Sequence, residues 1–97
     1  MTRVTIIGAD ETCEVADFPH AFAADQFISD QYPGHMIDPD WTRYDGRRCE
    51  VWRDPRALDL NLDATALYLV AHGDIGQSHA LDDFKLFGPI AIVQETK

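Results

Sequence analysis

Two histidines and three aspartates lie between positions 72 and 83, and these residue types bind metal ions in many proteins. His72 and His79 bracket a glycine-containing loop that also holds Asp74, and Asp82 and Asp83 follow it. Metal sites use short standard ligand spacings or facing positions on rigid elements, and this segment shows neither pattern. The sequence therefore favours a solvated polar loop. A small metal-binding protein or enzyme that uses His72 and His79 is the alternative.

Candidate nucleophiles are few, and none has the neighbours that would activate it. The two cysteines, Cys13 and Cys49, match neither a metal-binding spacing nor a CxxC redox motif. Ser29 and Ser78 do not stand in a nucleophile elbow or beside a recognisable base. Both cysteines lie in strand-like segments, so we expect buried free thiols rather than a disulfide. We therefore expect a non-enzymatic protein without a cofactor.

The first apolar segment ends at Gly8, as does the first strand of a dinucleotide-binding domain. That site needs two further glycines, so that the backbone and a helix N-terminus can approach the pyrophosphate. Here Ala9, Asp10 and Glu11 follow the glycine. Because two carboxylates would repel the phosphates, the sequence argues against nucleotide binding.

The chain is short and strongly acidic. It has 97 residues, with 17 acidic and 8 basic side chains, for a net charge of −9. Direct binding to nucleic acid or to an anionic membrane normally needs an excess of Lys and Arg, so both are argued against. The charge gives solubility, and it also attracts a basic partner. The segment before the first acidic residue is too short for a signal peptide, and we expect a cytoplasmic protein.

The charge is unevenly distributed along the chain. Residues 1–40 hold eight acids and one Arg, residues 57–97 hold six acids and two Lys, and residues 41–56 hold five Arg against three acids. This central segment also carries Trp41, Tyr44 and Trp52. Arg, Trp and Tyr dominate the energetics of many protein interfaces. The competing interpretation, about equally supported, is that the tryptophans pack inward and the arginines pair with the acidic remainder.

Strand-like and helical segments must position these groups. Residues 3–9 and 11–16 predict two strands joined by the turn at residues 8–11, because they are β-branched or alternate polar with apolar residues. Asp17 is the expected cap of a helix that runs to Tyr32, with Pro19 in its first turn. Pro33 and Gly34 end that helix.

The second half of the chain predicts further strands. Residues 35–40 form a connector or a short edge strand, and Asp45-Gly46 predicts a tight turn between residues 41–44 and 47–53. Leu58, Leu60 and Leu62 alternate with polar residues, as in a strand or a short helical turn. We expect residues 65–71 to form a strand, a short helix to start at Ser78, and a final strand over residues 89–94. The predicted fold is α+β, with a mainly antiparallel sheet of about five strands and one main helix on a face, in a single compact domain of residues 1–97.

These features favour an acidic protein-binding module that acts as a stoichiometric inhibitor and docks on a basic, nucleic-acid-binding protein surface. Its composition is similar to that of bacterial immunity proteins and phage-encoded nuclease inhibitors, including anti-CRISPR proteins. This likeness rests on no aligned residue. The acidic contact residues would be Asp10, Glu11, Glu14, Asp17, Asp82 and Asp83.

Two other modes of binding remain open. In one, the central hairpin makes the contact through Tyr44, Arg47, Arg48 and Trp52, and the acidic surface serves only solubility. In the other, the chain is a self-associating subunit, a homodimer in which an exposed edge strand at residues 88–95 pairs across a two-fold axis.

Overall fold

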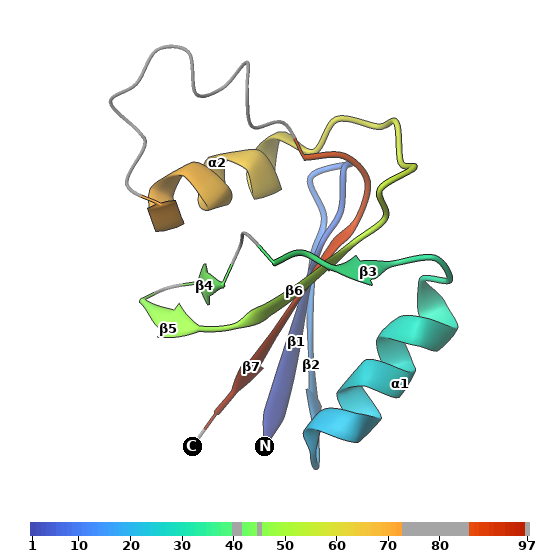
Figure 1. The fold of residues 1–97 in the computed structure, drawn as a ribbon, viewed down its shortest axis with the longest axis vertical. Helices are drawn as coiled ribbons and strands as arrows, with labels where there is room; N and C mark the ends of the chain where they lie inside the picture. Colours follow the sequence, from blue (N-terminus) through green and yellow to red (C-terminus); the bar gives the residue numbers. More distant parts are fainter. Residues whose placement is uncertain (40–41, 45, 73–85, 97) are drawn as a thin grey trace.

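A computed structural model describes residues 1–39, 42–44, 46–72 and 86–96 of the chain. Its main sheet has five antiparallel strands in the order β2-β1-β7-β6-β3 (Figure 1). The strands are β1 (Thr2–Ile7), β2 (Cys13–Phe18), β3 (Met36–Ile37), β6 (Glu50–Arg53) and β7 (Ile90–Glu95). The predicted α+β class and the antiparallel sheet of five strands are confirmed.

The N-terminal hairpin forms where the sequence predicts it. Strand β1 pairs with β2 in an unbroken register that runs from Thr2 opposite Phe18 to Ile7 opposite Cys13. Its turn, residues 8–12, lies at the end of the sheet opposite the two termini (Figure 1). Cys13 is exposed on the edge strand, so the expectation that both cysteines are buried is wrong for this residue. Both thiols are free, as predicted.

The main helix, α1 (Ala21–Gln31), packs on one face of the sheet, but Asp17 does not cap it. Strand β2 continues to Phe18, which places Asp17 inside the strand. The N-cap is His20, whose Nδ1 accepts a hydrogen bond from the Ala23 amide at 3.1 Å. The prediction was wrong because an aspartate followed closely by a proline is a frequent helix start. Only the pairing with β1 shows that the strand continues through Asp17.

The segment at residues 65–71 is helical, and the predicted strand there is wrong. Helix α2 (Leu62–His72) covers the opposite face of the sheet from α1. A short apolar run has no periodicity that separates a strand from a helix, so Tyr and Val content misled the prediction. The helix expected to start at Ser78 lies outside the described residues. Phe87, at its predicted end, forms an isolated bridge with Leu60.

Strand β7 lies in the interior of the sheet, between β1 and β6. The prediction that residues 88–95 form an exposed edge is therefore wrong, and these residues cannot pair with a second copy. The strand is buried on both faces because a helix covers each. Ala91 and Val93 face α1, together with Val4, Ala24 and Ile28. Ile90 and Ile92 face α2, together with Ile7, Val51, Ala64 and Leu86.

Strands β4 (Arg43–Tyr44) and β5 (Arg47–Arg48) form a separate two-stranded antiparallel ribbon. The predicted hairpin is confirmed for these residues, but the predicted strand over residues 47–53 is divided, because residues 50–53 form β6 of the main sheet. Asp45 lies outside the described residues. Gly46 has a φ of 74°, the left-handed conformation that a tight turn of this length requires. The predicted connector at residues 35–40 contains the short edge strand β3.

Candidate protein-binding surface

The turn between β1 and β2 is held by hydrogen bonds of its own. The amide of Gly8 donates to the Thr12 carbonyl at 2.9 Å, and the Thr12 hydroxyl donates to Oδ1 of Asp10 at 2.6 Å. The hydroxyl and backbone hydrogen bonds lower the pKa of Asp10, which therefore stays ionised. A Cβ at Gly8 would meet the Thr12 hydroxyl and the Asp10 carboxylate and would displace the hydrogen bond between them.

Glu11, at the tip of this turn, has an unusual backbone. Its φ is 68°, and it is the only residue other than glycine with a positive φ in the part of the chain that the structure describes. Cβ crowding makes this conformation unfavourable by about 1–2 kcal/mol for an ordinary L-residue. The Glu11 side chain is exposed and gains no burial in return.

Two depressions lie beside the turn, and both are lined by carboxylates. The larger is an open cleft of ≈ 340 Å³ with Asp10, Glu14 and Asp59 in its wall. The smaller has a volume of ≈ 50 Å³ and includes Glu11 and Asp63. We call these five residues the acidic end. No Lys or Arg among the described residues forms an ion pair with any of them.

Tyr32 also lines the larger cleft, at the C-terminal end of α1. Burial raises the pKa of its phenol, and the Glu14 carboxylate raises it further. The phenol is therefore neutral near pH 7 and offers a hydrogen bond inside an otherwise anionic cleft.

Exposed leucines accompany these acids. Leu58 is 90% exposed and Leu62 is 66% exposed, and Leu60 lines the smaller depression. A surface that combines unpaired charge with exposed apolar side chains is typical of a protein-binding site, because association removes the apolar groups from water. The sequence analysis missed this surface, because it interpreted the alternation of leucines with Asp59 and Asn61 only as a strand or a short helical turn.

A buried asparagine that the sequence reasoning missed fixes the acidic end to the sheet. Asn61 is fully buried and caps α2, since its Oδ1 accepts from the Ala64 amide at 3.0 Å. Its Nδ2 donates to the carbonyls of Ile7 at 2.9 Å and Gly88 at 2.8 Å. These bonds join the start of α2 to the end of β1. An Asn just before a helical apolar run is a helix-start signal that could have identified it.

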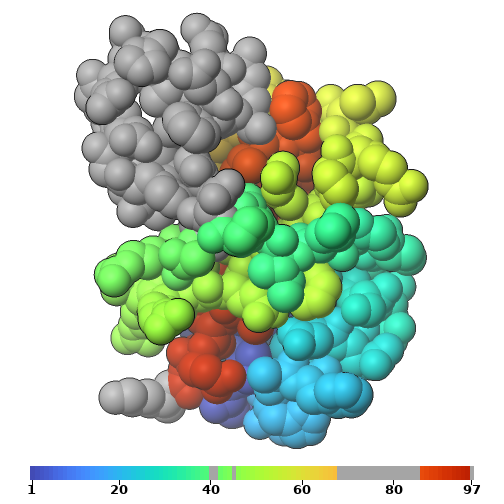
Figure 2. Space-filling view, viewed as in Figure 1, coloured from blue at the N-terminus to red at the C-terminus, as the bar shows by residue number. Residues whose placement is uncertain are grey.

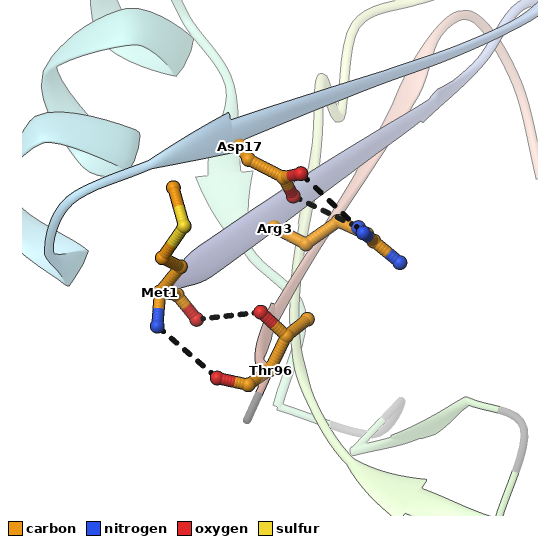
Figure 3. A network of polar contacts seen from close by, with 4 residues as sticks. All are labelled: Met1, Arg3, Asp17 and Thr96. Carbon is orange, nitrogen blue, oxygen red and sulfur yellow. Dashed lines mark hydrogen bonds and ion pairs between the residues drawn. The ribbon is translucent and has the colours of Figure 1, made fainter.

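Asp17 lies far from this surface, at the end of the sheet that holds both termini. It forms an ion pair with Arg3, whose Nε is 2.9 Å from Oδ1 (Figure 3). This hydrogen bond from Arg3 lowers the pKa of Asp17. Nearby, the Met1 amine donates to the Thr96 carbonyl at 3.1 Å. Asp17 therefore has a structural partner and does not join Asp10, Glu11 and Glu14.

The central segment divides between core and surface. Trp52 is half-buried against α1, and its indole N–H donates to Glu50 at 2.9 Å. Tyr44 is half-buried against the α2 side of the core, and its carbonyl accepts from Gln94 at 2.8 Å. Both aromatic residues thus support the fold more than they project from it. Trp41 lies outside the described residues.

The arginines of this segment also divide. Arg53 is 3.2 Å from buried Asp38, and Arg56 is 3.9 Å from Asp54. In contrast, Arg47 and Arg48 are exposed and form no ion pair with a described residue. We call β4, β5 and their turn the arginine hairpin. It lies at the left of the face shown in Figure 2, and the yellow segment before α2 lies at the upper right.

A second open cleft, of ≈ 330 Å³, lies between the N-terminal end of α1 and strands β6 and β7. Asp25, Arg48, Cys49 and Glu50 contribute to its wall. Burial raises the pKa of Cys49 to about 11, so its thiol stays protonated near neutral pH. A protonated thiol is a poor nucleophile, so Cys49 is not activated in this cleft.

The remaining sequence candidates fall outside what the structure describes. His79, Asp82 and Asp83 belong to residues 73–85, and of His72 only the backbone at the end of α2 is described. Among the described residues, no group of three or more His, Cys, Asp or Glu side chains is arranged to hold a metal ion. The helices seen in these same residues are too short or too polar to cross a membrane.

Comparison with protein-family models, with curated protein sequences and with solved structures finds no match to this chain.

Proposed function

We propose that this chain is an acidic protein-binding module, a stoichiometric inhibitor that docks its acidic end on a basic protein surface. The observation that carries the proposal is Glu11. It places an exposed, unpaired carboxylate at the tip of the turn, in a conformation where glycine would be more stable. Strained residues of this kind are concentrated at functional sites.

The neighbours of Glu11 support the same proposal. Asp10, Glu14, Asp59 and Asp63 add four carboxylates around the turn. A cluster of one sign accelerates association with an oppositely charged partner and makes the rate depend on salt. The exposed Leu58 and Leu62 supply the apolar contact that charge alone does not.

A partner that normally binds nucleic acid fits this chemistry, because its surface carries Lys and Arg positioned for phosphates. Competition for that surface makes the module an inhibitor, in the manner of immunity proteins and phage-encoded anti-CRISPR proteins.

The experiment compares capture from the native host by three baits. The first is the wild-type chain, the second carries Asp10→Asn, Glu11→Gln and Glu14→Gln, and the third carries Arg47→Ser and Arg48→Ser. We expect the wild-type chain and the hairpin variant to retain the same partner, and the acidic-end variant to lose it. The purified partner is then titrated at low and high salt. A dissociation constant that does not change with salt would contradict the charge-driven mode.

A second candidate is docking through the arginine hairpin, favoured by the exposure of Arg47 and Arg48. Arg48 lies directly opposite Arg43 in the ribbon, so basic side chains gather there and would suit an anionic partner. Loss of the partner by the hairpin variant alone would favour this candidate.

A further inference from the structure

Strand β2 forms one edge of the sheet and presents free backbone groups. The Gly8 amide donates to the Thr12 carbonyl, and the register continues from that pair without interruption along the hairpin. In an antiparallel pair, hydrogen-bonded positions alternate. Glu14 and Ala16 therefore bond to β1. The N–H and C=O groups of Cys13, Val15 and Asp17 consequently point away from the sheet.

The protection of this edge against strand addition is acidic, from Glu14 and Asp17, and it repels acidic strands but not basic ones. Edge strands are commonly protected by Lys, Pro, a bulge or a covering element. Strand β2 has neither Lys nor Pro, and its register has no bulge. Among the described elements it packs closely only on β1 and α1. Val15, at its centre, is 57% exposed.

We propose that an extended, Lys- or Arg-rich segment of the partner protein adds to β2 as a sixth strand of the sheet. This inference rests on the proposed function, because β2 begins at the acidic end and carries Glu14. The occupant is basic because Asp10, Glu11 and Glu14 surround the point where the strand begins. A second copy is disfavoured, since each chain carries a net charge of −9.

The two faces of β2 define the side chains of the added strand. Glu14 and Val15 lie on opposite faces, because successive residues in a strand alternate. A basic residue opposite Glu14 and an apolar residue opposite Val15 therefore give the favourable cross-strand pairs. The recognised segment thus alternates basic and apolar residues.

The test follows amide hydrogen exchange by NMR while a peptide of alternating Lys and Val is added to the full chain. We expect the amides of Cys13, Val15 and Asp17 to exchange about tenfold more slowly, as one new hydrogen bond each implies. The amides of Glu14 and Ala16 should not change. A peptide of alternating Glu and Val is the charge control and should give no protection.

Three results would overturn this inference. Binding of the Lys/Val peptide without protection of the three outward amides would show that it docks elsewhere. Absence of binding at low salt would show that the edge does not accept a basic strand. Protection without peptide that rises with protein concentration would identify a second copy as the occupant.

Substitutions at Val15 separate backbone pairing from charge. Val15→Pro removes one outward N–H and leaves the ladder with β1 intact, because proline is tolerated at such positions. Val15→Thr keeps both the N–H and the β-branched shape. We expect Val15→Pro to abolish the protection and Val15→Thr to retain it. If Val15→Pro does not fold, Cys13→Pro, which removes another outward N–H at the first residue of the strand, takes its place.

The outcomes for the two proposals are distinguishable. If the partner requires Glu11 and Glu14 but not the Val15 N–H, strand addition is wrong and the acidic docking surface stands. If the partner is retained after all three acids are neutralised, the proposed function itself is wrong.

Discussion

Two of the hairpins in the described part of the chain each have a residue in the left-handed conformation between their strands, and the residue differs. In the arginine hairpin the residue is Gly46, with a φ of 74°, and no atom lies within 4 Å of the position that a Cβ would occupy. In the turn between β1 and β2 it is Glu11, with a φ of 68°. The arginine hairpin has glycine at this position, which adopts a positive φ without strain. The turn between β1 and β2 has Glu11 there, although a positive φ is unfavourable for a residue with a Cβ.

The turn between β1 and β2 therefore combines a less stable backbone conformation with an exposed carboxylate, that of Glu11. Tyr44 of the hairpin and Trp52 of the following strand β6 contribute to the core, and two nearby arginines have acidic partners. At the acidic end, the charged groups face solvent and no described cation pairs with them. The comparison therefore assigns these hairpin-side groups to the fold and supports our proposal that recognition takes place at the acidic end.

The largest expected effect comes from removing the anchor of the acidic end. Asn61→Ala leaves two carbonyls and one amide without their partner in a buried site, and we expect a loss of about 3 kcal/mol in the free energy of unfolding. Urea denaturation measures it. Asn61→Asp retains the acceptor for the Ala64 amide and should not restore the bonds to Ile7 and Gly88. A loss below about 1 kcal/mol would show that the anchor is not needed.

The next effect is on the arginine hairpin. Gly46→Ala should destabilise the chain by about 1 kcal/mol, because alanine is strained at positive φ while its methyl group meets no neighbour. Thermal unfolding and the amide exchange of residues 43–48 report the change. Equal loss of partner binding in this variant would contradict the assignment of recognition to the acidic end.

Glu11→Gly should increase the free energy of unfolding, whereas Gly46→Ala should decrease it. Relief of the strained φ stabilises the folded chain, and the greater freedom of glycine in the unfolded chain offsets part of it, so we expect a gain of about 0.5–1 kcal/mol. Affinity for the partner should fall at the same time. Glu11→Gln is the matched control, because it loses the charge and keeps the strain. If Glu11→Gly is destabilising, Glu11 has a structural role that the comparison omits.

The smallest effect is expected at Asp17, which belongs to neither region. Its pKa is lowered in the folded chain by the hydrogen bond from Arg3. A carboxyl whose pKa is lower in the folded chain stabilises the folded state at pH values above its unfolded pKa. This contribution is lost as the pH falls through its pKa in the folded chain. Asp17→Asn should therefore be slightly less stable than the wild type at pH 7 and equal to it at strongly acidic pH. A difference that is constant with pH would show that the charge is not responsible.

Local sequence signals located the hairpins and most of the strands. Residues 3–9 and 11–16 alternate or are β-branched, and Asp45-Gly46 marks a turn, so pairing of neighbouring strands could be predicted from adjacent residues alone. The acidic residues Asp10, Glu11 and Glu14 were identified for the same reason, since all three lie on one turn. Asp59 and Asp63 were not identified, because they reach that surface only when the start of α2 is fixed to β1.

The sequence by itself determined the net charge, its uneven distribution and the local turns, because these depend on residue type and on near neighbours. Tertiary structure decided the rest. It fixed the start of α2 to β1 and to Gly88 through Asn61, and it placed β7 inside the sheet rather than at its edge. Each of these depends on contacts between residues distant in the chain, and no local pattern records which strand lies beside which.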